Sequence, residues 1–164
     1  MSRAGLATRK VTGMPTLRRA LPTDAALITS HRHRMFTDNQ FSTEAQLQAM
    51  DGAFEPWVRE RLADGRYVGL LLDDDGRIVA GAGIHFADFP PHYLHVEAGR
   101  AYLLNFYTEP AARGQGFAKF LLSACLEECR VRGSKVATLH ASRFGRPIYE
   151  KSGFTPMNEM MLAL

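Results

Sequence analysis

The residues best suited to chemistry in this sequence form a short glycine loop, Arg113-Gly114-Gln115-Gly116-Phe117-Ala118. The loop stands between an apolar run at 101–107 and an amphipathic run at 117–132. Two glycines let the backbone approach a ligand closely, and a helix that starts directly after them directs unpaired N–H groups and its positive dipole end to the same point. The sequence therefore predicts a phosphate-binding loop here.

Other glycine loops differ from this one in their letters. A nucleotide P-loop requires Gly-x-x-x-x-Gly-Lys-Ser/Thr, and a dinucleotide-binding loop requires a third glycine at the position where this chain has Lys119. An ordinary glycine turn that starts a surface helix is the remaining alternative. The residues on either side of the loop help to distinguish a phosphate-binding loop from an ordinary turn.

Two motifs resemble one known family. The order of strand, Glu109-Pro110, glycine loop and helix resembles the acetyl-CoA signature of the GNAT superfamily of N-acetyltransferases, Arg/Gln-x-x-Gly-x-Gly/Ala, and Arg113, Gly116 and Ala118 occupy its three fixed positions. Further on, residues 149–154, Tyr-Glu-Lys-Ser-Gly-Phe, resemble the closing motif of that family. Residues 1–65 fit the family only in the order of their elements.

The resemblance implies an α/β fold with a central mixed, mostly antiparallel sheet and helices on both faces. This sheet would be splayed open between its fourth strand, 101–108, and its fifth, 135–140. Acetyl-CoA, the acyl donor, would lie in the gap, with its pantetheine arm along the free edge of the fourth strand. The residues expected to contact it are Phe106, Tyr107, Thr108, Arg113, Gly114, Gln115, Gly116, Phe117, Ala118 and Ser142.

Acyl transfer to an amine requires a neutral amine, a donor for the charge that develops on the thioester carbonyl, and a proton for the departing sulfur. By resemblance the donor is a backbone N–H near Phe106, and Tyr149 stands where the family has its general acid. A phenol with a pKa of about 10 can protonate a departing thiolate. The alternative is that Tyr149 only packs on the last helix. Because the family transfers directly, neither Cys125 nor Cys129 need be catalytic.

The residue that takes a proton from the amine is not fixed by these letters. The candidates are His85, Asn105 as the holder of a water, Glu109 and His140. Asn105 stands within an apolar run, so that once buried it needs hydrogen bonds, either in a site or in a structural network. For His85 and His140, at predicted strand ends, a purely structural role is the alternative.

The acceptor pocket has the least motif content. His31, Arg32 and Arg34 on the first predicted helix are candidates for binding an anionic acceptor group, although helical spacing places Arg32 opposite His31, on a face expected to be solvated. The loop at 87–99 is longer than a hairpin needs and is expected to cover the site. Within it, His92 and His95 lack a third ligand at a typical spacing, so no metal site is predicted.

Composition favours a soluble globular protein. The 164 residues suffice for one domain, 46% of them are hydrophobic and 23% are charged. No window approaches the roughly 20 apolar residues of a membrane span, and the first residues lack the apolar core of a secretory signal. Two cysteines expected to be reduced favour a cytoplasmic location. The net charge of +3 is scattered without aromatic alternation, so that no nucleic-acid partner is predicted.

The pattern of apolar residues predicts the order of the elements. Residues 1–14 are expected to form a disordered tail and residues 15–164 a single domain. Gly52 and Pro56 favour two short helices or one bent helix after the capping box that Thr43 and Gln46 form. Strands are predicted at 16–20, 67–72, 77–86, 101–108, 135–140 and 154–164, and further helices from residue 22 and at 117–132 and 145–152.

These observations predict a GNAT-type N-acetyltransferase. It would move an acetyl group from acetyl-CoA to a primary amine of a small molecule or peptide by direct transfer in a ternary complex. Three alternatives stay open: a different acyl-CoA donor, an acyl-CoA-binding regulatory domain without turnover and, third, a nucleic-acid-binding module. The resemblance also makes a homodimer possible.

Overall fold

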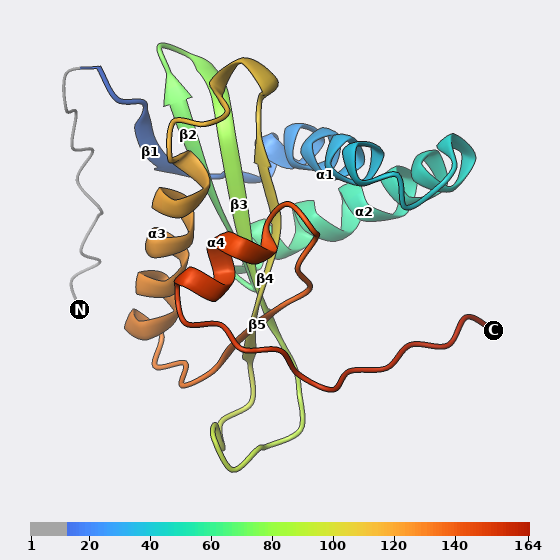
Figure 1. Cartoon of the computed structure of the whole chain (residues 1–164), viewed down its shortest axis with the longest axis vertical. Helices are drawn as coiled ribbons and strands as arrows, with labels where there is room; N and C mark the ends of the chain where they lie inside the picture. Colours follow the sequence, from blue (N-terminus) through green and yellow to red (C-terminus); the bar gives the residue numbers. More distant parts are fainter. Residues whose placement is uncertain (1–12) are drawn as a thin grey trace.

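A five-stranded sheet runs through the molecule in the order β1-β2-β3-β4-β5 (Figure 1). The structure, a computed structural model, describes residues 13–164. Adjacent strands are antiparallel except for β4 and β5, which are parallel, so the sheet is mixed and mostly antiparallel as predicted. The strands are β1 Thr16–Arg19, β2 Tyr67–Asp74, β3 Arg77–Ala87, β4 Arg100–Thr108 and β5 Ala137–Leu139.

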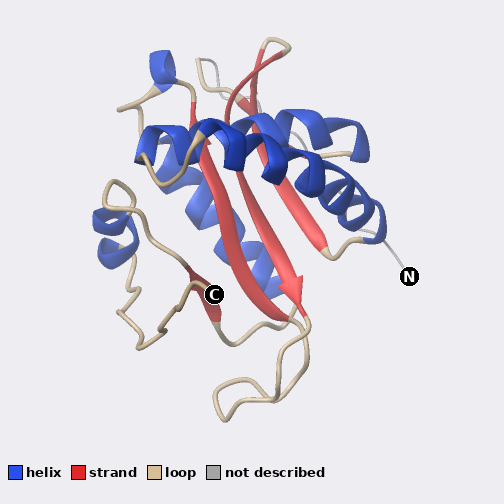
Figure 2. Ribbon diagram, turned by 90° about the vertical axis from the view of Figure 1, so that its right-hand side faces the viewer, coloured by secondary structure: helices blue, strands red, loops and turns tan. Residues whose placement is uncertain are grey.

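Helices cover both faces of this sheet. Figure 2 shows α1 and α2 crossing in front of the strands and α3 behind them. The crossover from β4 through α3 to β5 is what makes that last pair parallel. The helices are α1 Ala25–Asn39, α2 Glu44–Asp64, α3 Phe117–Val131 and α4 Arg146–Lys151, with short 3₁₀ helices η1 Pro22–Asp24 and η2 Pro110–Ala112.

Each face of the sheet has its own apolar core. Phe117, Leu121 and Cys125 recur on one side of α3 and are buried against the sheet, where helical periodicity predicts them. Phe120, which the same spacing places on that side, is 41% exposed. On the opposite face, Ile28 of α1 and Val58 of α2 pack in the cluster that contains Tyr67. The two cores fix the helices on either side of β4.

The splay between β4 and β5 starts after only three residue pairs. Pairing runs from Ala101 with Ala137 to Leu103 with Leu139 and then stops. Close to this point β4 carries a bulge, because its register with β3 shifts between Gly81 and Gly83. Asn105, at φ 57°, provides the left-handed conformation that such an irregularity uses and that asparagine tolerates. Beyond Leu103, no strand covers the edge of β4 that faces β5.

The first half of the chain follows the sequence closely. Of the two predicted forms after Thr43, two short helices or one bent helix, the structure has a single helix in which Pro56 is an interior residue. The predicted capping box is present, with the Thr43 side chain accepting a hydrogen bond from the Gln46 amide. The expected tail at residues 1–14 lies largely outside the described residues. No helix within residues 13–164 is both long and apolar enough to span a membrane.

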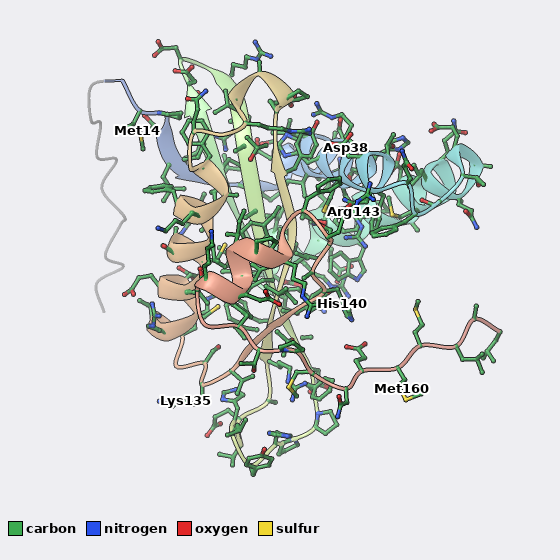
Figure 3. All side chains as sticks on the ribbon, in the orientation of Figure 1. Met14, Asp38, Lys135, His140, Arg143 and Met160 are labelled. Atoms are coloured by element: carbon green, nitrogen blue, oxygen red, sulfur yellow. The ribbon has the colours of Figure 1, made fainter. Side chains whose placement is uncertain are left out.

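The predicted strand at 154–164 is wrong. These residues follow α4 without regular secondary structure, and Figure 3 shows Met160 on a segment that extends away from the sheet. Phe154 still packs on the core, whereas Met157 and Met161 are exposed. A period-2 pattern specifies a strand only where a partner edge is available, and no strand of the described chain pairs with this segment.

Candidate functional site

A cleft of about 970 Å³ opens where β4 and β5 diverge. One wall is the C-terminal half of β4 with α1 beside it, and the opposite wall is the segment from the end of β5 to α4. The end of the cleft is formed by the glycine loop and the first turn of α3. Figure 3 labels His140 and Arg143 on the segment between β5 and α4, and Asp38 near the end of α1.

The glycine loop has the geometry expected of a phosphate-binding loop. Gly114 and Gly116 adopt positive φ angles of 77° and 83°, and both line the cleft. Added Cβ atoms at these two positions would meet nothing within 4 Å, so open space lies beside the backbone. Gly116 is the N-cap of α3, and no side chain in the described part of the chain caps the amides of the first turn. Those amides are therefore available to an anion.

Not every residue of the loop faces the cleft. Arg113, Phe117 and Ala118 line it, whereas Gln115 does not. The Arg113 guanidinium forms an ion pair with Asp38, Nη2 to Oδ2 2.7 Å, and its Nε donates to the Thr108 carbonyl at 3.0 Å. Arg113 thus ties the loop to α1 and to β4.

The free edge of β4 forms the long side of the cleft. Phe106, Tyr107 and Thr108 all line it, as the sequence predicts. Tyr107 is held in place on its other side by the His31 ring, at a centroid distance of 5.0 Å, and by Arg34. Beyond Leu103 this edge is unpaired on the β5 side within the described residues, which suits an extended ligand that adds to the sheet.

Tyr149 lies on the opposite wall, on α4, and lines the cleft. Its ring meets Phe106 of β4 edge-to-face, with centroids 5.8 Å apart. Burial raises the pKa of Tyr149 to about 12, so the phenol keeps its proton at neutral pH. Gly145 gives the ring its room, since a Cβ there would lie 2.8 Å from Cε2 of Tyr149. Ser142 also lines the cleft, and its Oγ accepts a hydrogen bond from the Gly145 amide at 3.1 Å.

Asn105 occupies the bulge and is almost fully buried. Its Nδ2 donates to the Tyr67 hydroxyl at 2.9 Å, and its Oδ1 accepts from Nη1 of Arg32 at 2.8 Å. Asn105 is also one of the residues that line the cleft. Both alternatives left by the sequence are therefore realised, because this amide belongs to a polar network and reaches the site.

His85 is not part of the cleft. It packs against the indole of Trp57, with ring centroids 4.9 Å apart, and its Nδ1 lies 3.3 Å from the Arg66 carbonyl. Burial lowers its pKa. This placement corrects the prediction that His85 acts at the site. His85 lies on the face of β3 that α1 and α2 cover, and its ring packs on Trp57 of α2 and does not line the cleft.

Glu109 is likewise removed from the cleft, and it contacts two of the three α1 residues that were candidates for binding an anionic acceptor, His31 and Arg34. Its Oε2 accepts from Nη1 of Arg34 at 2.8 Å, and its Oε1 lies 3.8 Å from Nε2 of His31. Its hydrogen bond to Arg34 is the largest cause that lowers the pKa of Glu109. Burial lowers the pKa of His31 to about 4, so this ring is neutral at pH 7. Neither His31 nor Arg34 lines the cleft.

Arg32 and Tyr102 are the cleft residues that sequence reasoning misplaced or missed. Of the three α1 candidates for binding an anion, Arg32 is the one that lines the cleft, and its guanidinium is not on a solvated face but lies 4.9 Å from the ring centroids of both Phe36 and Phe54. The Tyr102 hydroxyl forms a hydrogen bond of 2.6 Å with Nδ1 of His140. Nε2 of the same ring lies 2.9 Å from Oε2 of Glu159. The parallel pairing of the two strands brings Tyr102 beside Thr138, close to His140, a juxtaposition that the predicted crossover already contained.

The loop at 88–99 does not cover the site. None of its residues lines the cleft, because it connects the start of β4, whereas the glycine loop follows the end of that strand. Figure 1 shows it projecting from the lower end of the sheet. Within the described part of the chain, no three or more His, Cys, Asp or Glu side chains are grouped so as to hold a metal ion.

A splayed mixed sheet with a glycine loop at the helix after β4 defines a recognisable class of acyltransferase fold, and sequence comparison identifies the class. The family model for the acetyltransferase (GNAT) family matches residues 29–154. The chain belongs to this family and is an acyltransferase by membership. Comparison with curated proteins finds no match.

Solved structures of the same class resemble this chain over most of its length. A GCN5-related N-acetyltransferase from Ralstonia eutropha JMP134 is 34% identical with a TM-score of 0.87, and the match covers 93% of this chain and 99% of that one. A predicted acetyltransferase from Clostridium acetobutylicum, described with acetyl-CoA, is 31% identical with a TM-score of 0.82, covering 90% and 94%. Glucosamine-6-phosphate N-acetyltransferase from Arabidopsis thaliana, at 15% identity and a TM-score of 0.63, shares the fold.

Proposed function

We propose that this protein transfers an acetyl group from acetyl-CoA to a primary amine of a small molecule or peptide, directly and in a ternary complex. The observation that carries the proposal is a cleft in which an uncapped helix N-terminus, a free strand edge and a half-buried phenol meet. These three features match the three parts of an acyl-CoA: its diphosphate, its extended pantetheine arm and its sulfur.

The donor is held by backbone more than by side chains. The amides of Gly114, Gly116 and the first turn of α3 bind the diphosphate, because they are unpaired and carry the positive end of the helix dipole. The edge of β4 at 106–108 pairs with the amide groups of the pantetheine arm. A backbone N–H near Phe106, on the bulged edge, stabilises the negative charge of the thioester carbonyl in the transition state.

Tyr149 supplies the proton for the leaving group. When the amine nitrogen bonds to the carbonyl carbon and the carbon–sulfur bond breaks, the electron pair of that bond stays on sulfur. The Tyr149 hydroxyl donates its proton to this thiolate, and solvent returns a proton to the phenolate. A pKa raised to about 12 by burial keeps the phenol protonated until the thiolate forms.

His140 is the base that the geometry supports best, now that His85 and Glu109 lie outside the cleft. With Glu159 accepting the Nε2–H of His140, the Nδ1 atom is free to accept the proton of the Tyr102 hydroxyl. The hydroxyl oxygen takes a proton from the incoming ammonium group as its own proton passes to Nδ1. This relay delivers a neutral amine to the thioester and directs the proton toward solvent.

The decisive experiment is an amine panel with acetyl-CoA, in which release of free thiol is followed. Thiol release that depends on an amine, with formation of the acetylated amine, is the expected result. Binding of coenzyme A in calorimetry without thiol release for any amine would instead indicate an acyl-CoA-binding regulatory domain. Propionyl-CoA or a longer acyl-CoA as the better donor would keep acyl transfer and change the donor.

A further inference from the structure

Arg32 is a cleft residue whose charge has no acidic partner among the described residues. The other arginine that lines the cleft, Arg113, forms an ion pair with Asp38 at 2.7 Å. Arg34, which neighbours Arg32 on α1 but lies outside the cleft, forms one with Glu109. Arg32 forms no ion pair within residues 13–164. A guanidinium left without a counter-ion beside a ligand cavity is unusual, because taking a charge out of water is costly.

The donors of this guanidinium are largely unused. Nη1 of Arg32 donates to Oδ1 of Asn105 at 2.8 Å, and its buried Nε has no hydrogen-bond partner among residues 13–164. Arginine carries five N–H donors in a planar fork, so most of them are free for a ligand. Burial lowers the pKa of Arg32, with small opposing contributions from Tyr67 and Tyr102, yet an arginine stays protonated at neutral pH.

The surroundings of Arg32 fix the direction of the fork. The guanidinium lies 4.9 Å from the ring centroids of Phe36 and Phe54 and is anchored to the amide of Asn105. A group held at so many points is pre-organised, which lowers the entropy cost of binding an anion. Its position beside the bulge places it next to the part of β4 where the proposed acyl group would end.

We infer that Arg32 binds a carboxylate carried by the acceptor, so that the acceptor class is a primary amine with a nearby carboxylate, such as an amino acid or a peptide end. This inference rests on the proposed function. A single guanidinium fork matches one carboxylate in charge and in bidentate geometry. The Tyr102 hydroxyl, whose pKa burial raises and the charge of Arg32 lowers, faces the same region and is where the amine would give up its proton.

The first experiment compares three matched acceptors: an amino acid, its carboxamide, and the amine that remains when the carboxylate is removed. We expect kcat/KM of the wild-type enzyme to favour the carboxylate by about 10- to 100-fold, the usual worth of a charge-assisted hydrogen bond. Arg32→Met keeps the apolar length of the side chain and should abolish this preference, with the loss in KM. Arg32→Lys keeps the charge without the fork and should recover part of it.

Two outcomes would overturn the inference. If Arg32→Met lowers kcat/KM equally for all three acceptors, Arg32 only supports Asn105 and the aromatic rings. If an amine with a phosphate group is used better than the carboxylate, the anion is a phosphate. Arg59→Met is the matched control, because Arg59 is an exposed residue of α2 outside the cleft and should leave all three values unchanged.

A second measurement does not depend on turnover. Calorimetry with coenzyme A present compares the N-acetylated amino acid with its carboxamide. Tighter binding of the carboxylate by the wild type, and its loss in Arg32→Met, supports the subsite even if no acetyl transfer is found, in which case the proposed function alone fails. Equal binding of the two products by the wild type would refute the subsite while leaving acetyl transfer intact.

Discussion

Under the proposed function, the cleft has a donor half and an acceptor half. Tyr149 and Phe106 meet across the donor half, while Arg32 and Asn105 are joined by a hydrogen bond beside the acceptor half. The side chains that make up this division come from elements far apart in the sequence. The role of each can be separated by substitution, because the donor half is bound mostly through backbone.

Replacing Tyr149 by Phe should lower kcat by about 100-fold, the lower range for loss of a general acid. The affinity for coenzyme A should stay within a few-fold of wild type, because the phenyl ring keeps its contact with Phe106. Steady-state kinetics and calorimetry measure the two quantities. Tyr93→Phe, on an exposed loop outside the cleft, is the control. A Tyr149→Phe enzyme with undiminished kcat would leave this phenol a packing role only.

The glycine loop was easier to locate from the sequence than the residues expected to bind the acceptor, and the reason is physical. A phosphate-binding loop is local: residues 113–118 contain both the glycines and the helix start. Arg32 was placed on the wrong face because α1 lies against β4 on one side and against α2 on another, so its buried surface is wider than one apolar stripe. His85 lies opposite the cleft residue Tyr102 in the sheet, but its ring packs on Trp57 of α2, and a contact between elements so far apart in the sequence has no local signal.

At the scale of elements, the site depends on how α4 is joined to β5. Ser142 and Gly145 form the turn that starts α4, and the helix then presents Tyr149 to the cleft. The turn that starts α4 is local, whereas the strand predicted after this helix, at 154–164, is not and does not form. A strand requires a partner that lies elsewhere in the fold, and no pattern in residues 154–164 can indicate whether that edge is available.

Gly145→Ala should lower kcat by about 10-fold or more while the protein stays folded. The φ of Gly145 is −82°, which alanine adopts freely, but its Cβ would lie 2.8 Å from the Tyr149 ring and displace it. Gly52→Ala is a matched control in the interior of α2, where an added Cβ meets nothing within 4 Å. That change should raise the free energy of unfolding by about 0.5–1 kcal/mol and leave kcat unchanged. Equal kinetics for both variants would contradict the proposed packing.

At the scale of the whole molecule, two buried groups link stability to solution conditions. His31 is held neutral between α1 and β4, with its ring 5.0 Å from that of Tyr107. Cys125 and Cys129 are free thiols in the core beneath α3. Neither His31 nor the two cysteines take part in the proposed reaction, so measurements on them test the stability of the fold and not catalysis.

The free energy of unfolding should fall as the pH drops from about 6.5 toward about 4, by up to about 3 kcal/mol from His31. In this window the unfolded chain binds a proton at His31 and the folded protein does not, so acid favours unfolding. Urea denaturation at several pH values measures the slope. His31→Leu should flatten the part of the slope that belongs to this ring. An equal slope in the wild type and in His31→Leu would mean that the pKa of His31 is the same in the folded and unfolded protein.

Native protein should resist thiol reagents, since both cysteines are at most 4% exposed and burial raises their pKa values, that of Cys129 to about 11. Labelling should therefore follow the rate of unfolding. A Cys125→Ala, Cys129→Ala variant should keep its acetyltransferase activity, and mass spectrometry should find no acetylated protein during turnover. An acetyl thioester on either residue would disprove direct transfer.

The brief contact between β4 and β5 has a consequence for the protein in the cell. Only three residue pairs of the described chain join β5 to β4, and beyond them the edge of β4 can accept one more strand. If the acyl donor occupies that edge, the substrate also completes the sheet and stabilises the fold. Resistance to heat and to proteases would then track the supply of the coenzyme, by RT ln(1 + [L]/Kd). The abundance of this enzyme would rise and fall with the metabolite it consumes.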